Sequence, residues 1–338
     1  MKFDRALHLP RQRDNIFVPI ISGKSRRFDR RFPTRDVSQW LCGSLSQMPI
    51  ELPLIVMVHG QGFSPMNART DPFSSIFAFD PYHDTITPHW LLHSWASRFS
   101  APPHLQGSNV QIGYGWHAHS DAFIRLANFE NIASQAMDEA DQFAEFLKAV
   151  EKIQPERKIH LISNGLGAKV ILRAMEFARL FNIERCILLE SHATVTEALL
   201  VLNRKSTRNT QFYNIFAKPN RRLRFLNAKM QKSGPADQML AFCFPFQRQN
   251  WVDIPLDDKI AMANVLDGPI KPLRRPCTKS FATHLYSEDL IRRILFSAKE
   301  TSASALKKKM SDRLRPFKMR KAFFPHYLDP LIYFKWPA

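Results

Sequence analysis

The chain has 338 residues, of which 45% are hydrophobic, and it carries 48 lysines and arginines against 30 aspartates and glutamates, a formal net charge of +18. This length is enough for one large domain or two smaller ones with a sizeable core. The opening stretch, MKFDRALHLPRQRDN, lacks the continuous apolar core of a secretory signal, and no apolar run is long enough to span a bilayer. We therefore expect a soluble, cytoplasmic protein without a transmembrane segment.

The positive charge is concentrated in three stretches. Residues 1–36, 198–236 and 299–338 together carry 29 of the basic residues but only 7 of the acidic ones, so the rest of the chain has a net charge of −4. Basic stretches of this kind favour weak contact with polyanions or with a membrane surface.

Taken in chain order, short apolar runs alternate with helical patterns. One β-like run lies at 15–21. Further runs typical of strands buried on both faces follow at 52–58, 109–115, 158–163, 185–190 and 211–217. The spacing of apolar residues predicts helices over 121–153, ending before Pro155, and over 167–181 and 287–298.

This alternation indicates an α/β protein with a doubly wound, mostly parallel sheet and helices on both faces. We predict a basic N-terminal arm with a possible edge strand over residues 1–50 and a main domain over 51–298. The main domain would contain a loop-rich cap inserted at about 64–108, and a basic, aromatic extension would follow over 299–338. Binding and chemistry in such folds gather in loops at the carboxyl ends of the strands.

Two of these strand ends are rich in glycine. IVMVHGQGF, residues 55–63, is an apolar strand that ends in His-Gly-Gln-Gly, and glycines there let backbone N–H groups converge as in an oxyanion hole. LISNGLGAKV, residues 161–170, runs a strand into a helix through a turn of five residues. The strand followed by His-Gly and the five-residue elbow resemble the α/β-hydrolase superfamily of serine esterases and lipases, over roughly residues 50–300.

The resemblance implies a Gly-x-Ser-x-Gly elbow with the nucleophilic serine at its centre. In this chain Gly165 stands at the nucleophile position and Ser163 at the first glycine, whereas Gly167 is retained. Glycine at the centre adopts a positive φ without strain, but it cannot attack a carbonyl. The donors of the oxyanion hole implied by the resemblance come from Gly60, Gln61 and Leu166.

The resemblance also implies an acid and a histidine. In the family the acid usually follows the strand that corresponds to 211–217, but a basic cluster takes its place here: Lys218, Arg221, Arg222 and Arg224. Some family members carry the acid one strand earlier, where Glu190 lies. The family's histidine comes before the last helix, where this chain has His284. With no nucleophile to activate, His284 would be a remnant at the mouth of the pocket.

Metals and cofactors are not expected. The cysteines at 42, 186, 243 and 277 are far apart and predict free thiols in a reducing compartment. His117 and His119 could share one side of an extended segment, but no third ligand of fixed spacing accompanies them. The residues that we expect to line a pocket at the strand ends are His59, Trp116, His117 and His192.

The leading hypothesis is a pseudoenzyme: a hydrolase-like protein that has lost serine chemistry and binds a small acyl-type ligand, an anionic ligand or a protein partner in the former active site. The first alternative is a working esterase or lipase that uses Ser163 or Ser191 with His284 and Glu190. The second is a polyanion-binding protein, because arginines and lysines alternate with aromatic residues in NRRLRFLNAKM and near the C-terminus.

Overall fold

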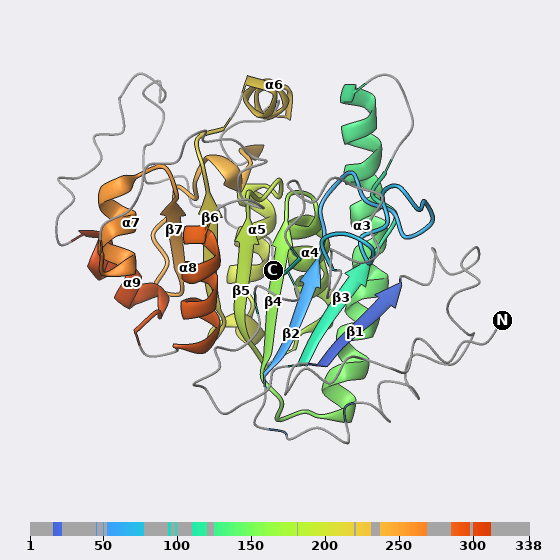
Figure 1. Ribbon diagram of the computed structural model, residues 1–338, viewed down its shortest axis with the longest axis horizontal. Coiled ribbons are helices and arrows are strands. Elements are labelled where there is room, and N and C mark those ends of the chain that lie inside the picture. The colour runs from blue at the N-terminus through green and yellow to red at the C-terminus, as the bar shows by residue number, and fades with distance from the viewer. Residues whose placement is uncertain are drawn as a thin grey trace, which may run out of the picture.

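The computed structural model describes residues 16–21, 45, 50, 53–77, 94–95, 99, 110–119, 125–180, 182–219, 221–230, 237–268, 285–297 and 300–311. This part of the chain forms a sheet of seven strands, all parallel, in the order β1-β3-β2-β4-β5-β6-β7 (Figure 1). The strands are β1 (Ile16–Ile21), β2 (Leu54–Val58), β3 (Val110–Gly115), β4 (Ile159–Asn164), β5 (Ile183–Leu189), β6 (Gln211–Phe216) and β7 (Trp251–Pro255).

Helices cover both faces of the sheet. One core joins α3 (Arg125–Ile153), α4 (Gly167–Ala178) and α5 (Val195–Leu202) to strand residues such as Val56 and Leu161. A second core joins α7 (Lys259–Leu266), α8 (Leu285–Phe296) and α9 (Ala303–Ser311) to alternate strand residues such as Ile55 and Ile162. We call these the α3–α5 face and the α7–α9 face. The remaining helix, α6 (Arg221–Met230), lies beyond the carboxyl ends of the strands (Figure 1).

The predicted fold class is confirmed. All residues of β2 and β3 are buried, as continuous apolar runs predict for strands covered on both faces. The periodic positions of the predicted first helix are also buried: Phe129, Ile132, Ala136, Ala140, Phe143, Leu147 and Val150. The buried sheet therefore follows directly from the hydrophobic pattern.

Several elements do not stand out in the sequence. β7 is only five residues long and includes Asp253, and α5 is apolar on nearly all sides, so neither has a clear period. α9 lies in the low-complexity stretch SASALKKK, yet its Ala303, Leu306 and Met310 are buried in the core of the α7–α9 face. Their spacing of three and four residues, together with the helix-forming alanines, leucine and lysines, is the helical signal in that stretch.

β1 occupies one edge of the sheet, where it pairs with β3. Most of the expected cap at 64–108 and all residues after 311 lie outside the described residues. None of the helices in the described part of the chain combines the length and apolar character needed to cross a membrane.

The chain reverses its direction of winding between β2 and β4. β2 continues to β3 on one side, whereas β4 continues through β5 and β6 to β7 on the other, and β2 and β4 are hydrogen-bonded neighbours. The loops that follow such a pair diverge and leave a crevice at the carboxyl ends of the strands, where ligands of doubly wound proteins bind. Both glycine-rich segments end on this switch point.

Glycines allow the backbones to approach closely there. A Cβ on Gly167 would lie 2.5 Å from the carbonyl oxygen of His59 and 2.7 Å from that of Val58. A Cβ on Gly60 would lie 2.7 Å from the carbonyl oxygen of Asn164. The first turn of α4 therefore rests on the end of β2 with no room for a side chain between them.

Replacing Gly167 by alanine is expected to lower the free energy of unfolding by about 2–3 kcal/mol, because the new methyl group overlaps two backbone oxygens that cannot move independently. Gly268→Ala is the matched control, since a Cβ at that position meets no atom of the described residues within 4 Å. The control should change stability by less than about 0.5 kcal/mol. Urea unfolding followed by circular dichroism measures both, and equal stabilities would contradict the close packing.

Candidate functional site

His59, which directly follows β2, is fully buried and hydrogen-bonded to Trp116. Its Nε2 accepts the backbone N–H of Trp116 at 3.0 Å, and its Nδ1 lies 2.9 Å from the carbonyl oxygen of Gly60. The indole N–H of Trp116 donates to the carbonyl oxygen of His59 at 2.9 Å, and the two rings stack. These partners require a neutral ring with its proton on Nδ1, and burial lowers the pKa of His59 to about 4. His59 thus holds the loop after β2 against the end of β3.

Gly165 lies at the apex of the turn between β4 and α4, with φ of +52°. Its N–H donates to the carbonyl oxygen of Leu189 at 3.0 Å, and its own carbonyl oxygen accepts the N–H of His192 at 3.0 Å. The turn is therefore tied on both sides to the end of β5. A residue with a Cβ is strained in this left-handed conformation, and glycine removes that strain.

The side chain of Gln61 closes over this apex. Its Oε1 accepts the N–H of Leu166 at 3.2 Å, and a Cβ on Gly165 would lie 2.6 Å from the same oxygen. In a catalytic elbow the N–H of the residue after the nucleophile stabilises the oxyanion. Here that donor already holds a carbonyl oxygen, and the carboxamide takes the space that a side chain at position 165 would need. Gln61 is exposed, so its side chain can rotate away without disturbing the core.

The two alternative serines are fully buried. Ser163 is in β4, between Val58 of β2 and Leu188 of β5, and its Oγ has no hydrogen-bond partner among the described residues. Ser191 Oγ accepts the N–H of Ala193 at 3.2 Å, as in a local turn. Within the described part of the chain, no imidazole is hydrogen-bonded to either hydroxyl.

Glu190 directly follows β5 and combines three unusual properties. Its φ is +44°, it is only 4% exposed, and its Oε1 has no hydrogen-bond partner in the described part of the chain. Burial raises the pKa of this carboxyl group to about 8, so the neutral acid predominates at neutral pH. A strained, buried and titratable residue is typical of a functional site. Glu190 is next to Leu189, whose carbonyl oxygen holds Gly165.

The other expected pocket residues are dispersed. His192 is buried with its ring 5.6 Å from that of Phe129 on α3. His117 is half-buried, and its Nδ1 lies 2.8 Å from the hydroxyl of Ser64, in the loop after β2. His284 lies outside the described residues. The described residues that meet at the switch point are thus Gly60, Gln61, Gly165 and Leu166, beside the loop that carries Glu190, Ser191 and His192.

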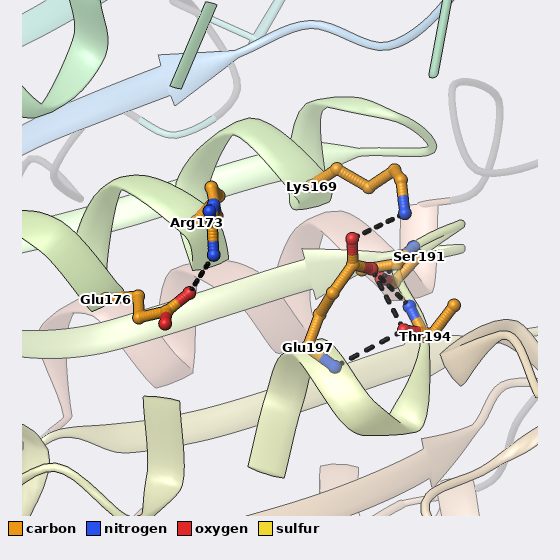
Figure 2. A network of polar contacts seen from close by, with 7 residues as sticks. Lys169, Arg173, Glu176, Ser191, Thr194 and Glu197 are labelled. Atoms are coloured by element: carbon orange, nitrogen blue, oxygen red, sulfur yellow. Dashed lines mark hydrogen bonds and ion pairs between the residues drawn. The ribbon is translucent and has the colours of Figure 1, made fainter. Parts of the chain in front are cut away.

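A partly buried ion pair fixes that loop to α4. Figure 2 shows Lys169 of α4 reaching Glu197 of α5, with Nζ and Oε1 2.5 Å apart. The other carboxylate oxygen, Oε2, accepts the N–H of Thr194 at 2.7 Å, while the Thr194 hydroxyl accepts the N–H of Glu197 at 3.3 Å. This reciprocal cap starts α5 and positions the residues between β5 and α5. The sequence shows the cap as Thr-x-x-Glu, but it does not show the partner on α4.

The basic cluster expected after β6 forms part of α6 and the segment before it. Lys218, Arg221 and Arg224 are exposed, and Phe225 is 54% exposed on the same helix. Asn227 on the buried side of α6 accepts the N–H of Met239 at 2.8 Å, and Met239 in turn pairs with Thr194. α6 is therefore connected to the loop after β5. The structure describes the position of Arg222 in α6 but not its side chain.

Comparison with known proteins adds no family: no protein-family model and no curated protein sequence matches this chain. The fold and the site define the class, a parallel α/β protein of the doubly wound kind with a glycine-rich switch point. Its sheet and the position of its elbow are compatible with a hydrolase-like arrangement.

Glu190→Gln is expected to flatten the pH dependence of stability between about pH 5 and pH 8. The folded protein holds the proton of Glu190 with a pKa of about 8, against 4.5 for a free carboxyl group. The proton of Glu190 contributes its full share to the free energy of unfolding below the unfolded pKa of 4.5. This contribution, at most about 5 kcal/mol, is lost as the pH rises through the folded pKa of about 8. Urea unfolding at pH 5.0, 6.5 and 8.0 measures the slope.

The control is Glu156→Gln, which removes an exposed carboxylate from a turn. If the difference in unfolding free energy between wild type and Glu190→Gln stays constant over these three pH values, Glu190 is ionised in the folded protein and the assignment is wrong.

Proposed function

We propose that this protein is a hydrolase-like α/β protein that binds the carboxylate or carbonyl group of a small ligand at the switch point between β2 and β4, without cleaving it. One observation carries the proposal. The turn that would present a nucleophile presents Gly165, and the backbone donor beside it already binds an oxygen, Oε1 of Gln61.

The absence of catalysis follows from the chemistry of the apex. Acyl transfer by a serine hydrolase needs a hydroxyl at the attacking position and an imidazole that accepts its proton. Gly165 has no side chain, and the hydroxyls of Ser163 and Ser191 are buried away from solvent. Resemblance in fold alone supports neither activity nor its loss, whereas the chemistry of these three positions bears on it directly.

The backbone N–H of Leu166 supports binding of a ligand through a carboxylate or carbonyl oxygen. Leu166 is the N-cap of α4, a helix of 12 residues, and the N-terminal end of a helix attracts negative charge. The Gln61 carboxamide acts as an intramolecular substitute for the ligand, because it brings a carbonyl oxygen to the Leu166 N–H. An incoming carboxylate would replace a neutral oxygen by a charged one, and hydrogen bonds to charged groups are stronger.

The surroundings favour a negatively charged ligand. Glu190 is mostly neutral at neutral pH and so repels an anion little. Arg221 and Arg224 on α6 add positive charge beyond the same ends of the strands (Figure 1). Their exposed positions make this a long-range attraction and not a specific contact.

Butyrate is a suitable probe. In 15N–1H spectra of the full chain, titration with sodium butyrate, at ionic strength matched with sodium chloride, should shift the amide signals of Leu166 and Gly165 saturably. Gln61→Ala removes the competing oxygen and should lower the Kd of butyrate about threefold or more, whereas Gln61→Glu places a fixed carboxylate on the donor and should raise it at least tenfold.

These two variants change the same exposed side chain, so each serves as the control for the other. Equal Kd values in wild type and both variants, or butyrate shifts confined to residues outside the switch point, would refute binding at the Leu166 N–H.

A further inference from the structure

A second polar cluster lies on the α7–α9 face, near the amino ends of β4 and β5. His160 and Arg185 are register partners on these neighbouring strands. Side chains two positions apart on a strand point to the same face. His160 lies two positions before Ile162, and Arg185 lies two positions before Ile187, and both isoleucines belong to the core of the α7–α9 face. Both polar side chains therefore point to that face. His160 is 2% exposed and Arg185 is 3% exposed. The cluster is thus separated by the length of the strands from the switch point.

A bulge brings a third ionisable residue to this place. Ile159 pairs with Ile183, but the next pair is His160 with Arg185, so Glu184 is an extra residue in β5. Bulges of this kind redirect side chains and are common beside functional sites. The result is that Glu184 and Arg185 are both neighbours of His160.

The carboxylate of Glu184 contacts His160 and Lys158. Its Oε2 lies 3.0 Å from Nε2 of His160, and its Oε1 lies 3.4 Å from Nζ of Lys158. Arg185, in contrast, has neither a hydrogen-bond partner for Nε and Nη1 nor an ion pair in the described part of the chain. The nearby carboxylate of Glu184, whose pKa Arg185 helps to lower, binds His160 and Lys158 instead. Buried donors without acceptors are costly, and natural proteins rarely keep them.

His160 supplies an acceptor beside this cation. Burial lowers the pKa of His160, so the ring is neutral, and its proton is on Nε2 because that nitrogen donates to Glu184. The same hydrogen bond holds the pKa of Glu184 at about 2. Nδ1 therefore carries a lone pair, and it has no hydrogen-bond partner among the described residues. The cluster therefore combines N–H donors of Arg185 with an acceptor, Nδ1 of His160, and neither has a hydrogen-bond partner among the described residues.

Two polar side chains of β6 bind the connection between α8 and α9. Tyr213 donates its hydroxyl to the carbonyl oxygen of Thr301 at 2.9 Å. Gln211, the register partner of Arg185 on β6, accepts the N–H of Ala303 at 3.0 Å through Oε1. Neither side chain neutralises Arg185. Lys158, which contacts Glu184, has a side chain that is 65% exposed to solvent.

We propose that Arg185 and His160 bind a phosphate group that keeps one proton. Oxygens of the phosphate accept hydrogen bonds from the guanidinium, and its remaining O–H donates to Nδ1 of His160. An ionised carboxylate or a sulfate has only acceptor oxygens, so it cannot donate a hydrogen bond to Nδ1 of His160. Inorganic phosphate and a phosphate monoester share this chemistry, and a monoester with a second pKa near 6 still carries its proton in slightly acidic solution.

Thermal unfolding of the full chain at pH 6.0 tests the site, with inorganic phosphate, glycerol 3-phosphate and sulfate compared at equal ionic strength. Phosphate at about 100 times its Kd should raise the Tm of wild type by roughly 4 °C, and sulfate should have a clearly smaller effect. A larger shift with glycerol 3-phosphate than with inorganic phosphate identifies a monoester as the ligand, and the reverse identifies the free ion.

Arg185→Met should abolish the response to phosphate, while its Tm without phosphate stays close to that of wild type, because the substitution removes both two buried donors without acceptors among the described residues and an attraction to Glu184. Arg208→Met, which removes an exposed arginine, should respond like wild type. A second readout needs no variant: phosphate should shift the Nδ1 resonance of His160 saturably. An unchanged His160 resonance, or equal phosphate responses in Arg185→Met and wild type, would overturn the proposal.

Discussion

The structure depends on the direct contact of three backbone segments at the switch point. The first turn of α4 rests on the last residues of β2, and the turn before it is bonded to the end of β5. This contact requires glycine at positions 60 and 167, because a Cβ at either would overlap a carbonyl oxygen. The same packing directs the Leu166 N–H toward the segment after β2, where Gln61 meets it. The position of the candidate site is therefore a consequence of how the core is packed.

Two acids illustrate how the same fold gives carboxylates opposite properties. Glu190 is buried, its Oε1 has no hydrogen-bond partner among the described residues, and its pKa rises to about 8. Glu184 is half-exposed and bonded to His160, and its pKa falls to about 2. The first is thus a neutral group beside the Gly165 turn, and the second is a fixed charge at the other end of the sheet. The neutral Glu190 is near the anionic ligand that we propose at the switch point, and the charged Glu184 is near the cationic Arg185.

The sheet could be predicted from the sequence because strands buried on both faces leave continuous apolar runs, and α3 because its apolar residues keep a helical period. The elbow could be located from its glycines. The role of Gln61 could not, since the sequence suggests a backbone donor after β2 and does not reveal that a side chain from the same segment fills the apex. Arg185 begins the apolar run RCILLE in the sequence, and only the structure places it beside His160 and Glu184, with no hydrogen-bond partner for Nε and Nη1 among the described residues.

Reaction with a fluorophosphonate probe tests the central claim most directly, because the probe forms a covalent bond only with an activated nucleophile. The account predicts that the intact protein stays unlabelled, as judged by mass spectrometry, since position 165 has no side chain and the nearby serines are buried. Labelling in a one-to-one ratio that disappears in Ser163→Ala or Ser191→Ala would contradict it, and the protein would then be a working serine hydrolase.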